Sequence, residues 1–369
     1  MFHKLLKTDW ILTLSAMLLL GISMAVLYSI SMATQSEGSL SIFWRQFIFI
    51  LVGIFFMLVF SKINYQTLRA RSTIIYFLTL LVLLGVLIFG RTIRGTAGWI
   101  GVGSFHIQPV EVAKISMIIF LASFISQKKM ELEETGRLIV SLILAGIMIL
   151  LVLKQPDFGS AMVLVGIWLG TTLVSGISLR KIIAMLLLGL SIATAGWFVL
   201  QPYQKDRVLS LVHPESMDPH GAGYNVIQAI IAVGSGGLTG KGIGHGSQAQ
   251  LNFLPEKHTD FIFASISEEL GLFGSLLAIG LYLLMLYRMR IIAINAPDNF
   301  SYLVVVGIML MFFVQILENI GMNIGLMPVT GIPLPLLSYG GSSLITIMIS
   351  IGILNNIYSR KETMISRED

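Results

Sequence analysis

Several ionisable residues of this 369-residue chain lie at the ends of strongly apolar stretches, where a charge is costly and therefore suggests a function. Asp260 directly precedes a long apolar stretch. A carboxylate there can act as a general base, or it can stabilise the N-terminal end of a helix as a cap or first-turn acid. Helical spacing places small and acidic residues on one face with it: Ala264, Ser267, Glu268 and Gly271. Such a face turns away from lipid toward the protein interior or a cavity, and the residues alone leave both interpretations of Asp260 open.

Further acids stand at the entrances of other apolar stretches. Glu111 and Lys114 are three residues apart on an incoming helix. They form either an internal ion pair or a site in which the lysine contacts an anionic group that enters from outside. Asp157 lies at a third entrance. Three more acids fall inside apolar stretches, and ionisable residues at membrane depth are functional candidates by default: Glu268, Glu269 and Glu318.

The glycine-rich run 234–247, GSGGLTGKGIGHGS, suggests a phosphate-binding loop, but its spacing excludes one. A P-loop that ends at Lys241 requires Gly at 235 and Ser or Thr at 242, and the chain has Ser235 and Gly242. We therefore interpret the run as a flexible or tightly turning external loop, whose backbone N–H groups can still cradle an anion. The histidines lack the HExxH spacing of a zinc site, so the sequence predicts no dedicated metal site built from protein ligands.

The elements that must position these residues are membrane helices. The chain is 55% hydrophobic and 12% charged, whereas a soluble domain carries roughly 25% charged residues. It has no cysteine, which excludes disulfides, a Cys-ligated zinc site and a thiol nucleophile. We predict an all-α integral membrane protein, one polytopic domain over residues 1–369, with a large extracytoplasmic loop at 201–260 between spans seven and eight. Ten segments qualify as spans: about 11–31, 42–61, 74–90, 112–126, 137–153, 160–177, 182–200, 261–287, 302–323 and 340–358.

The distribution of charge predicts the orientation. If the N-terminus is cytoplasmic, most of the 24 basic residues fall in short inner connections, as the positive-inside rule requires. Both termini are then cytoplasmic, and the basic excess needs no nucleic-acid partner to explain it. The outer connections hold most of the prolines and many of the glycines, and binding and catalysis concentrate in such loops.

Four long blocks resemble a known family. They are GTAGWIGVGSFHIQPVEVAK at 95–114, QPDFGSA at 155–161, GAGYNVIQAIIAVGSGGLTGKGIGHGSQAQLNFLPEKHTDFIFASISEELG at 221–271 and GIPLPLLSYGGSS at 331–343. Through these blocks the chain resembles, over essentially its whole length, the SEDS family (shape, elongation, division and sporulation). The GKG and GHGSQ strings are more similar to its RodA branch of peptidoglycan glycosyltransferases than to the FtsW division branch.

The resemblance implies an enzyme of the bacterial cytoplasmic membrane that polymerises lipid II into glycan strands on the outer face during cell elongation. It implies partnership with a class B penicillin-binding protein, a transpeptidase that cross-links the product, and with other membrane proteins of the elongation complex. The family's essential acid matches Asp260, in the string PEKHTDF. Glu111, Lys114 and Asp157 match positions that are functionally sensitive in the family.

The chemistry that this activity requires agrees with the residues. A sugar hydroxyl attacks the anomeric carbon of a lipid-pyrophosphate sugar, so we expect Asp260 to act as general base and cations to steady the departing pyrophosphate. A divalent ion, Mg²⁺ or Mn²⁺, could assist. The expected contacts to substrate are Lys114, Glu111, Asp157, Arg94, Lys205, Arg207, His258 and Ser338. Two alternatives stay open: a flippase or transporter for lipid-linked precursor, and a non-catalytic scaffold of the elongation complex.

Overall fold

The computed structural model describes residues 8–33, 40–93, 96–102, 105–127, 134–196, 222–251 and 253–365. Three of the expected substrate contacts, Arg94, Lys205 and Arg207, lie outside these residues. The elements are α2 (Trp10–Ala33), α3 (Leu40–Lys62), α4 (Tyr65–Phe89), β1 (Arg91–Ile93), β2 (Thr96–Val102), β3 (Phe105–Ile107), α5 (Pro109–Ser126), α6 (Glu134–Lys154), α7 (Phe158–Val174), α8 (Leu179–Gly196), α10 (Ala222–Ser235), α11 (Ser247–Gln250), α12 (Ile262–Ile294), α13 (Asn299–Asn323) and α14 (Gly341–Ile365).

The predicted class, a helical integral membrane protein, is confirmed. Each predicted span overlaps one of the helices α2 to α8 or α12 to α14. Within the described ranges, eight helices are long and apolar enough to cross a membrane, and α7 is a shorter apolar helix. α4 begins at Tyr65, well before the predicted residue 74. The prediction started late because polar and basic residues form the first turns of this helix. The Asn64 side chain caps it by accepting a hydrogen bond from the Gln66 N–H.

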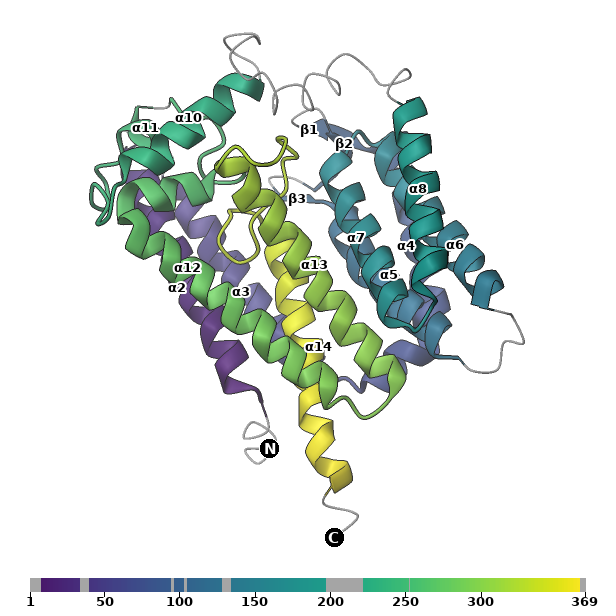
Figure 1. The fold of residues 1–369 in the computed structure, drawn as a ribbon. Helices are drawn as coiled ribbons and strands as arrows, with labels where there is room; N and C mark the ends of the chain where they lie inside the picture. The colour runs from purple at the N-terminus through teal and green to yellow at the C-terminus, as the bar shows by residue number, and fades with distance from the viewer. Residues whose placement is uncertain are drawn as a thin grey trace.

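Two departures from the all-helical prediction lie between α4 and α12. A small antiparallel sheet in the order β1-β2-β3 connects α4 to α5. The predicted loop 201–260 contains the helices α10 and α11. Figure 1 shows the sheet, α10 and α11 at one end of the helix bundle and both chain termini at the other. The polar motifs and the termini therefore occupy opposite ends of the molecule.

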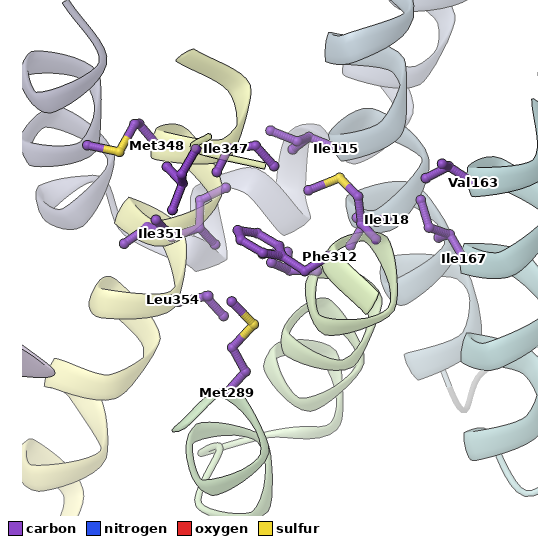
Figure 2. Packing of buried hydrophobic residues seen from close by; sticks show 14 of the residues in the cluster. Ile115, Ile118, Val163, Ile167, Met289, Phe312, Ile347, Met348, Ile351 and Leu354 are labelled. Atoms are coloured by element: carbon purple, nitrogen blue, oxygen red, sulfur yellow. The ribbon is translucent and has the colours of Figure 1, made fainter. Parts of the chain in front are cut away.

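The centre of the bundle is built from α5, α13 and α14. Lipid is as apolar as these side chains, so close van der Waals fit, not exclusion from water, stabilises their packing. Figure 2 shows Phe312 of α13 between Ile118 of α5 and Ile351 of α14. Gly307 of α13 permits this approach, because a Cβ at that position would lie 2.7 Å from Cγ2 of Ile118. α5 is thus an inner helix, which explains why it tolerates charged residues that a lipid-facing helix would not.

α12 is broken at Gly271, whose φ of 65° and ψ of −161° interrupt the helix. This corrects the predicted polar face that runs from Asp260 to Gly271. The helix begins only at Ile262, so Asp260 lies in the preceding turn, and the face ends at the break. Residues 262–270 therefore form a short half-helix that is oriented separately from the rest of α12.

The glycine-rich run holds the break of α12 in place. The backbone N–H of Lys241 donates to the Glu268 carbonyl at 3.0 Å, and the N–H of Leu272 donates to the Gly237 carbonyl at 2.9 Å. Gly240 lies so close that a Cβ on it would be 2.1 Å from the carbonyl oxygen of Glu269. The run is therefore a tight turn whose glycines allow two backbones to lie in contact. Of the flexible loop and the tightly turning loop that the sequence suggested, the structure shows the second. We call residues 236–244 with 267–273 the backbone clamp.

Candidate active site

A cavity of about 300 Å³ opens where several of the sequence blocks named above converge, near the sheet end of the bundle. Its walls come from segments that are far apart in the sequence: α3, the sheet, the start of α5, the turn before α7, residues 259–260 and the segment 330–343. The lining residues that matter for chemistry are Arg45, Trp99, His106, Glu111, Asp157 and Asp260. The structure thus brings three of the predicted acids to one cavity.

Asp260 reaches the cavity from the turn that precedes α12. The N-cap residue of α12 is Phe261, whose side chain makes no capping hydrogen bond, so Asp260 lies one position before the N-cap. Its backbone carbonyl instead accepts hydrogen bonds from the side-chain amides of Asn319 and Asn323, at 2.9 and 3.0 Å. These bonds fix the main chain of Asp260, and the carboxylate borders the cavity.

The segment 331–340, which we call the strap, is hydrogen-bonded to the turn that carries Asp260. The hydroxyl of Ser338 donates to the Thr259 carbonyl at 2.6 Å, and the Tyr339 N–H donates to the His258 carbonyl at 2.8 Å. Ser338 and His258 are not among the residues that line the cavity. The structure therefore places these two predicted substrate contacts behind the wall, where they hold Asp260 in position.

Asp157 has a structural partner on each oxygen. Oδ1 accepts from the Ser160 N–H at 2.9 Å and so caps α7, and Oδ2 accepts from the Gln108 side chain at 3.1 Å. The residue also lines the cavity. Its carboxylate therefore shapes the cavity wall and contributes negative charge to it.

Glu111 and Lys114 form the buried ion pair that was one of the two interpretations. Lys114 Nζ lies 2.8 Å from Glu111 Oε1, and the two side chains are 0% and 2% exposed. Glu111 lines the cavity and Lys114 does not. In this structure the lysine is placed to neutralise and orient Glu111. We had expected its charge to face the cavity, and it does not.

Sequence reasoning missed Arg45 as a site residue. Arg45 projects from α3 and lines the cavity, where it supplies a cation from a different wall than Asp260. The signal was present, because Arg45 lies inside a predicted span, at its outer end, and a basic residue there calls for a partner. The next residue, Gln46, fastens this part of α3 to the strap by accepting from the Gly340 N–H at 3.3 Å.

Trp99 of β2 is the large aromatic side chain on the sheet side of the cavity. The sheet is fixed to the bundle through a 3.2 Å hydrogen bond from the Ala97 N–H to the Gln155 carbonyl. An indole offers an apolar face with an N–H at its edge, which suits a ligand that has both C–H and hydroxyl groups, such as a sugar ring. The sheet therefore contributes one wall of the cavity.

The described residues contain no cluster of three or more acids and histidines that could hold a metal ion. Asp157 and Glu111 are already engaged by donors of the protein. These residues do not fit a resident metal site.

The chain matches the family model FtsW/RodA/SpoVE, described as cell cycle protein, over residues 9–363. The peptidoglycan glycosyltransferase MrdB of Escherichia coli (strain K12) is 38% identical over 351 residues, which are 94% of each chain. Stage V sporulation protein E of Bacillus subtilis (strain 168) is 38% identical over 368 residues, 98% of this chain and 100% of that protein.

Two solved structures are similar to the whole chain. A chain from a peptidoglycan synthase complex, described as coordinating polymerization and crosslinking, aligns with a TM-score of 0.81 at 27% identity and covers 96% of this chain and 98% of its own. The rod shape determining protein RodA of Thermus thermophilus aligns with a TM-score of 0.70 at 26% identity and covers 95% and 96% of the two chains.

Proposed function

The chain belongs to the FtsW/RodA/SpoVE family of cell cycle proteins, and we propose that it is a RodA-type peptidoglycan glycosyltransferase. We propose that it polymerises lipid II on the outer face of the bacterial cytoplasmic membrane during cell elongation. The observation that carries this proposal is the cavity in which Asp260 and Arg45 stand on separate walls at the end of the bundle away from the termini.

The two residues match the two needs of glycosyl transfer. The hydroxyl of the acceptor sugar attacks the anomeric carbon of the donor and gives its proton to Asp260, which requires hydrogen-bond reach. The bond from that carbon to the pyrophosphate oxygen breaks, and Arg45 stabilises the charge of the departing lipid pyrophosphate. The pyrophosphate bond already holds the energy for the reaction, so the mechanism needs no ATP.

The other site residues support these two. Glu111, oriented by Lys114, and Asp157 make an acidic wall that accepts hydrogen bonds from sugar hydroxyls or amides, and Trp99 offers an apolar surface to a sugar ring. Arg94, Lys205 and Arg207 remain proposed pyrophosphate contacts. A divalent ion, Mg²⁺ or Mn²⁺, would act as a companion of the substrate pyrophosphate.

The proposed partner is a class B penicillin-binding protein, with other elongation-complex membrane proteins. Similarity to a chain from a synthase complex that combines polymerization and crosslinking supports this choice. We further propose that both termini are cytoplasmic, which agrees with their position at one end of the bundle and with the bias of basic residues toward that side.

The direct test uses purified protein with its class B partner and fluorescent lipid II in detergent, and separates the glycan product on a gel. We expect Asp260→Asn to lower polymer formation by about 10² to 10⁴, the usual contribution of a general base. Glu134→Gln, which removes a partly exposed ion pair with Lys181 whose residues do not line the cavity, is the matched control. Polymer at wild-type level from Asp260→Asn would show that Asp260 is not the base.

The same assay separates the alternatives. A flippase or transporter forms no polymer in detergent, where there are no two sides to transport between. A non-catalytic scaffold also forms none, but it keeps its partner when Asp260 is changed. Glycan formation by the wild-type protein therefore contradicts both.

A further inference from the structure

Leu336 has a strained backbone in the middle of the strap. Its φ is +67°, in the left-handed region that a residue with a side chain rarely adopts. Such a conformation persists only where the surrounding structure holds it. Leu336 lies in the turn 334–338, in which the N–H groups of Leu337 and Ser338 both donate to the Leu334 carbonyl, at 3.2 and 3.0 Å. These two bonds lie within the turn, so the groups that hold it from outside have to be found on other elements.

Two side chains hold the carbonyls on either side of Leu336. The hydroxyl of Tyr282 in α12 donates to the Pro335 carbonyl at 2.5 Å, and the hydroxyl of Ser23 in α2 donates to the Leu337 carbonyl at 2.6 Å. Tyr282 is 1% exposed and Ser23 is 0% exposed. Neither α2 nor α12 contributes a residue to the cavity wall. The strained residue is therefore held on both sides by helices that do not line the cavity.

The same turn fixes the residue that precedes Asp260. The Ser338 hydroxyl accepts from the Leu334 N–H at 2.8 Å and donates to the Thr259 carbonyl at 2.6 Å. A rotation of the peptides at 335–337 would move this hydroxyl, and with it the hydrogen bond to Thr259. Every step from Tyr282 to Asp260 is thus a hydrogen bond or a covalent connection of a few residues.

This connection also bridges the break of α12. Tyr282 lies after Gly271, whereas Asp260 precedes the half-helix 262–270. The backbone clamp joins the two parts of α12 at the break, and the strap provides a second link between Tyr282 and Thr259. A single link would leave the half-helix a pivot at the break. Two separate links define its orientation.

The need to satisfy a buried hydroxyl does not explain which acceptor Tyr282 binds. A buried tyrosine hydroxyl needs some acceptor, and Tyr76 of α4 shows the ordinary case. It is also 1% exposed, and its hydroxyl donates to the Leu144 carbonyl of α6 at 2.6 Å. Tyr282 instead donates to a carbonyl next to the strained residue of the strap. Tyr76 therefore serves as a matched control for the loss of a buried tyrosine hydroxyl.

We propose that Tyr282 and Ser23 are positioning residues of the active site. They hold the carbonyls that flank Leu336, and so keep the Ser338 hydroxyl where it fixes the turn that carries Asp260. Without either hydroxyl the strained turn relaxes, and Asp260 moves relative to the sugar hydroxyl from which it takes a proton. This effect on catalysis rests on the proposed glycosyltransferase function, whereas the effect on the strap does not.

The effect on the strap is tested by hydrogen–deuterium exchange of the protein in detergent, followed by mass spectrometry. The peptide to follow contains Ser338 and Tyr339. Their N–H groups donate to the carbonyls of Leu334 and His258, so their exchange requires the turn to open. The rate of exchange in this peptide therefore reports how firmly the strap is held, whether or not the protein is an enzyme.

Tyr282→Phe and Ser23→Ala should each speed this exchange about two- to tenfold, the factor that corresponds to the net contribution of one hydrogen bond. Tyr76→Phe is the control for the first variant. Ser31→Ala is the control for the second, because Ser31 is also buried on α2 but its hydroxyl donates within its own helix, to the Leu27 carbonyl. Both controls should leave the exchange of the strap unchanged. Equal exchange in Tyr282→Phe and Tyr76→Phe would overturn the proposal.

The positioning role is tested by kinetics with lipid II. Tyr282→Phe should lower kcat about tenfold with KM changed less than about twofold, because the geometry of reaction is altered more than substrate binding. In a Ser338→Ala background it should lower kcat less than about twofold further, because the link to Thr259 is already lost. Tyr76→Phe should keep the wild-type kcat even where its melting temperature falls.

An unchanged kcat in Tyr282→Phe would refute the positioning role, and so would a full tenfold loss that persists without the Ser338 hydroxyl. If the wild type makes no polymer, the proposed function fails. The exchange experiment then still decides whether Tyr282 and Ser23 hold the strap.

Discussion

The backbone clamp predicts a large effect from one added methyl group. In Gly240→Ala the new Cβ would lie 2.1 Å from the Glu269 carbonyl oxygen and 2.6 Å from the Gly271 nitrogen. Ordinary contact begins near 3.5 Å, so the two backbones must separate by roughly 1 Å. Because residues 262–270 form a half-helix that begins two residues after Asp260, this displacement is transmitted to the carboxylate.

The chain provides a control for the backbone strain alone. Gly240 has a φ of +82° and Gly237 a φ of +55°, so alanine at either position costs about 1–2 kcal/mol in the left-handed region. A Cβ on Gly237, however, meets no atom within 4 Å. A difference in activity between the two variants therefore reports the steric clash at Gly240 and not the backbone strain.

The assay compares lipid II polymerisation and apparent melting temperature for Gly237→Ala and Gly240→Ala. A displacement of about 1 Å at a catalytic group costs up to about 10²-fold in rate, so we expect kcat to fall between tenfold and a hundredfold in Gly240→Ala. Gly237→Ala should lower the melting temperature with kcat close to wild type. If both variants lose the same activity, the clamp does not position Asp260, and the reasoning is refuted.

Three further results are expected. Arg45→Ala should lower kcat/KM for lipid II about tenfold or more, because a cation that stabilises the departing pyrophosphate is lost. Arg69→Ala, in the first turns of α4, should leave kcat/KM unchanged; equal kcat/KM values for the two variants would exclude Arg45 as the contact. Burial lowers the pKa of Lys257, and Glu269 partly opposes this shift. At pH values between the lowered pKa and the ordinary value near 10.5, the unfolded chain therefore binds more protons than the folded one. At pH values below this range the buried lysine carries its charge and destabilises the folded state. Lys257→Met should therefore raise the melting temperature near neutral pH, and the increase should shrink as the pH rises through the range. An increase in melting temperature that does not depend on pH would contradict this explanation. Chelation of divalent ions should slow polymerisation without lowering the melting temperature of substrate-free protein, and a lowered melting temperature would indicate a resident metal site.

The helices were predictable because each depends on a local property, a run of apolar residues long enough to cross a bilayer. α5 carries a lysine, Lys114, which lies in the first turn of the predicted span 112–126 and in the second turn of the helix itself. Its placement depends on neighbours that the local sequence does not reveal, namely α13 and the Glu111 carboxylate. The sheet was missed because β1 and β3 have three residues each, too few for an alternating pattern.

The candidate site was predictable where a residue's chemistry alone is informative. Asp260, Asp157 and Glu111 were identified as acids at span entrances, and all three line the cavity. Ser338 and Arg45 show the limit. Ser338 lies in the block 331–343 and Arg45 inside a predicted span, and only the fold determines that the hydroxyl of Ser338 binds the Thr259 carbonyl while Arg45 faces the cavity.

Asn319 explains how Asp260, the proposed general base, is held firmly in a turn. Its side-chain amide has two N–H donors. They bind the Asp260 carbonyl at 2.9 Å and the Ile332 carbonyl at 2.7 Å. One side chain of α13 thus sets the spacing between the turn that carries the base and the strap at 331–340.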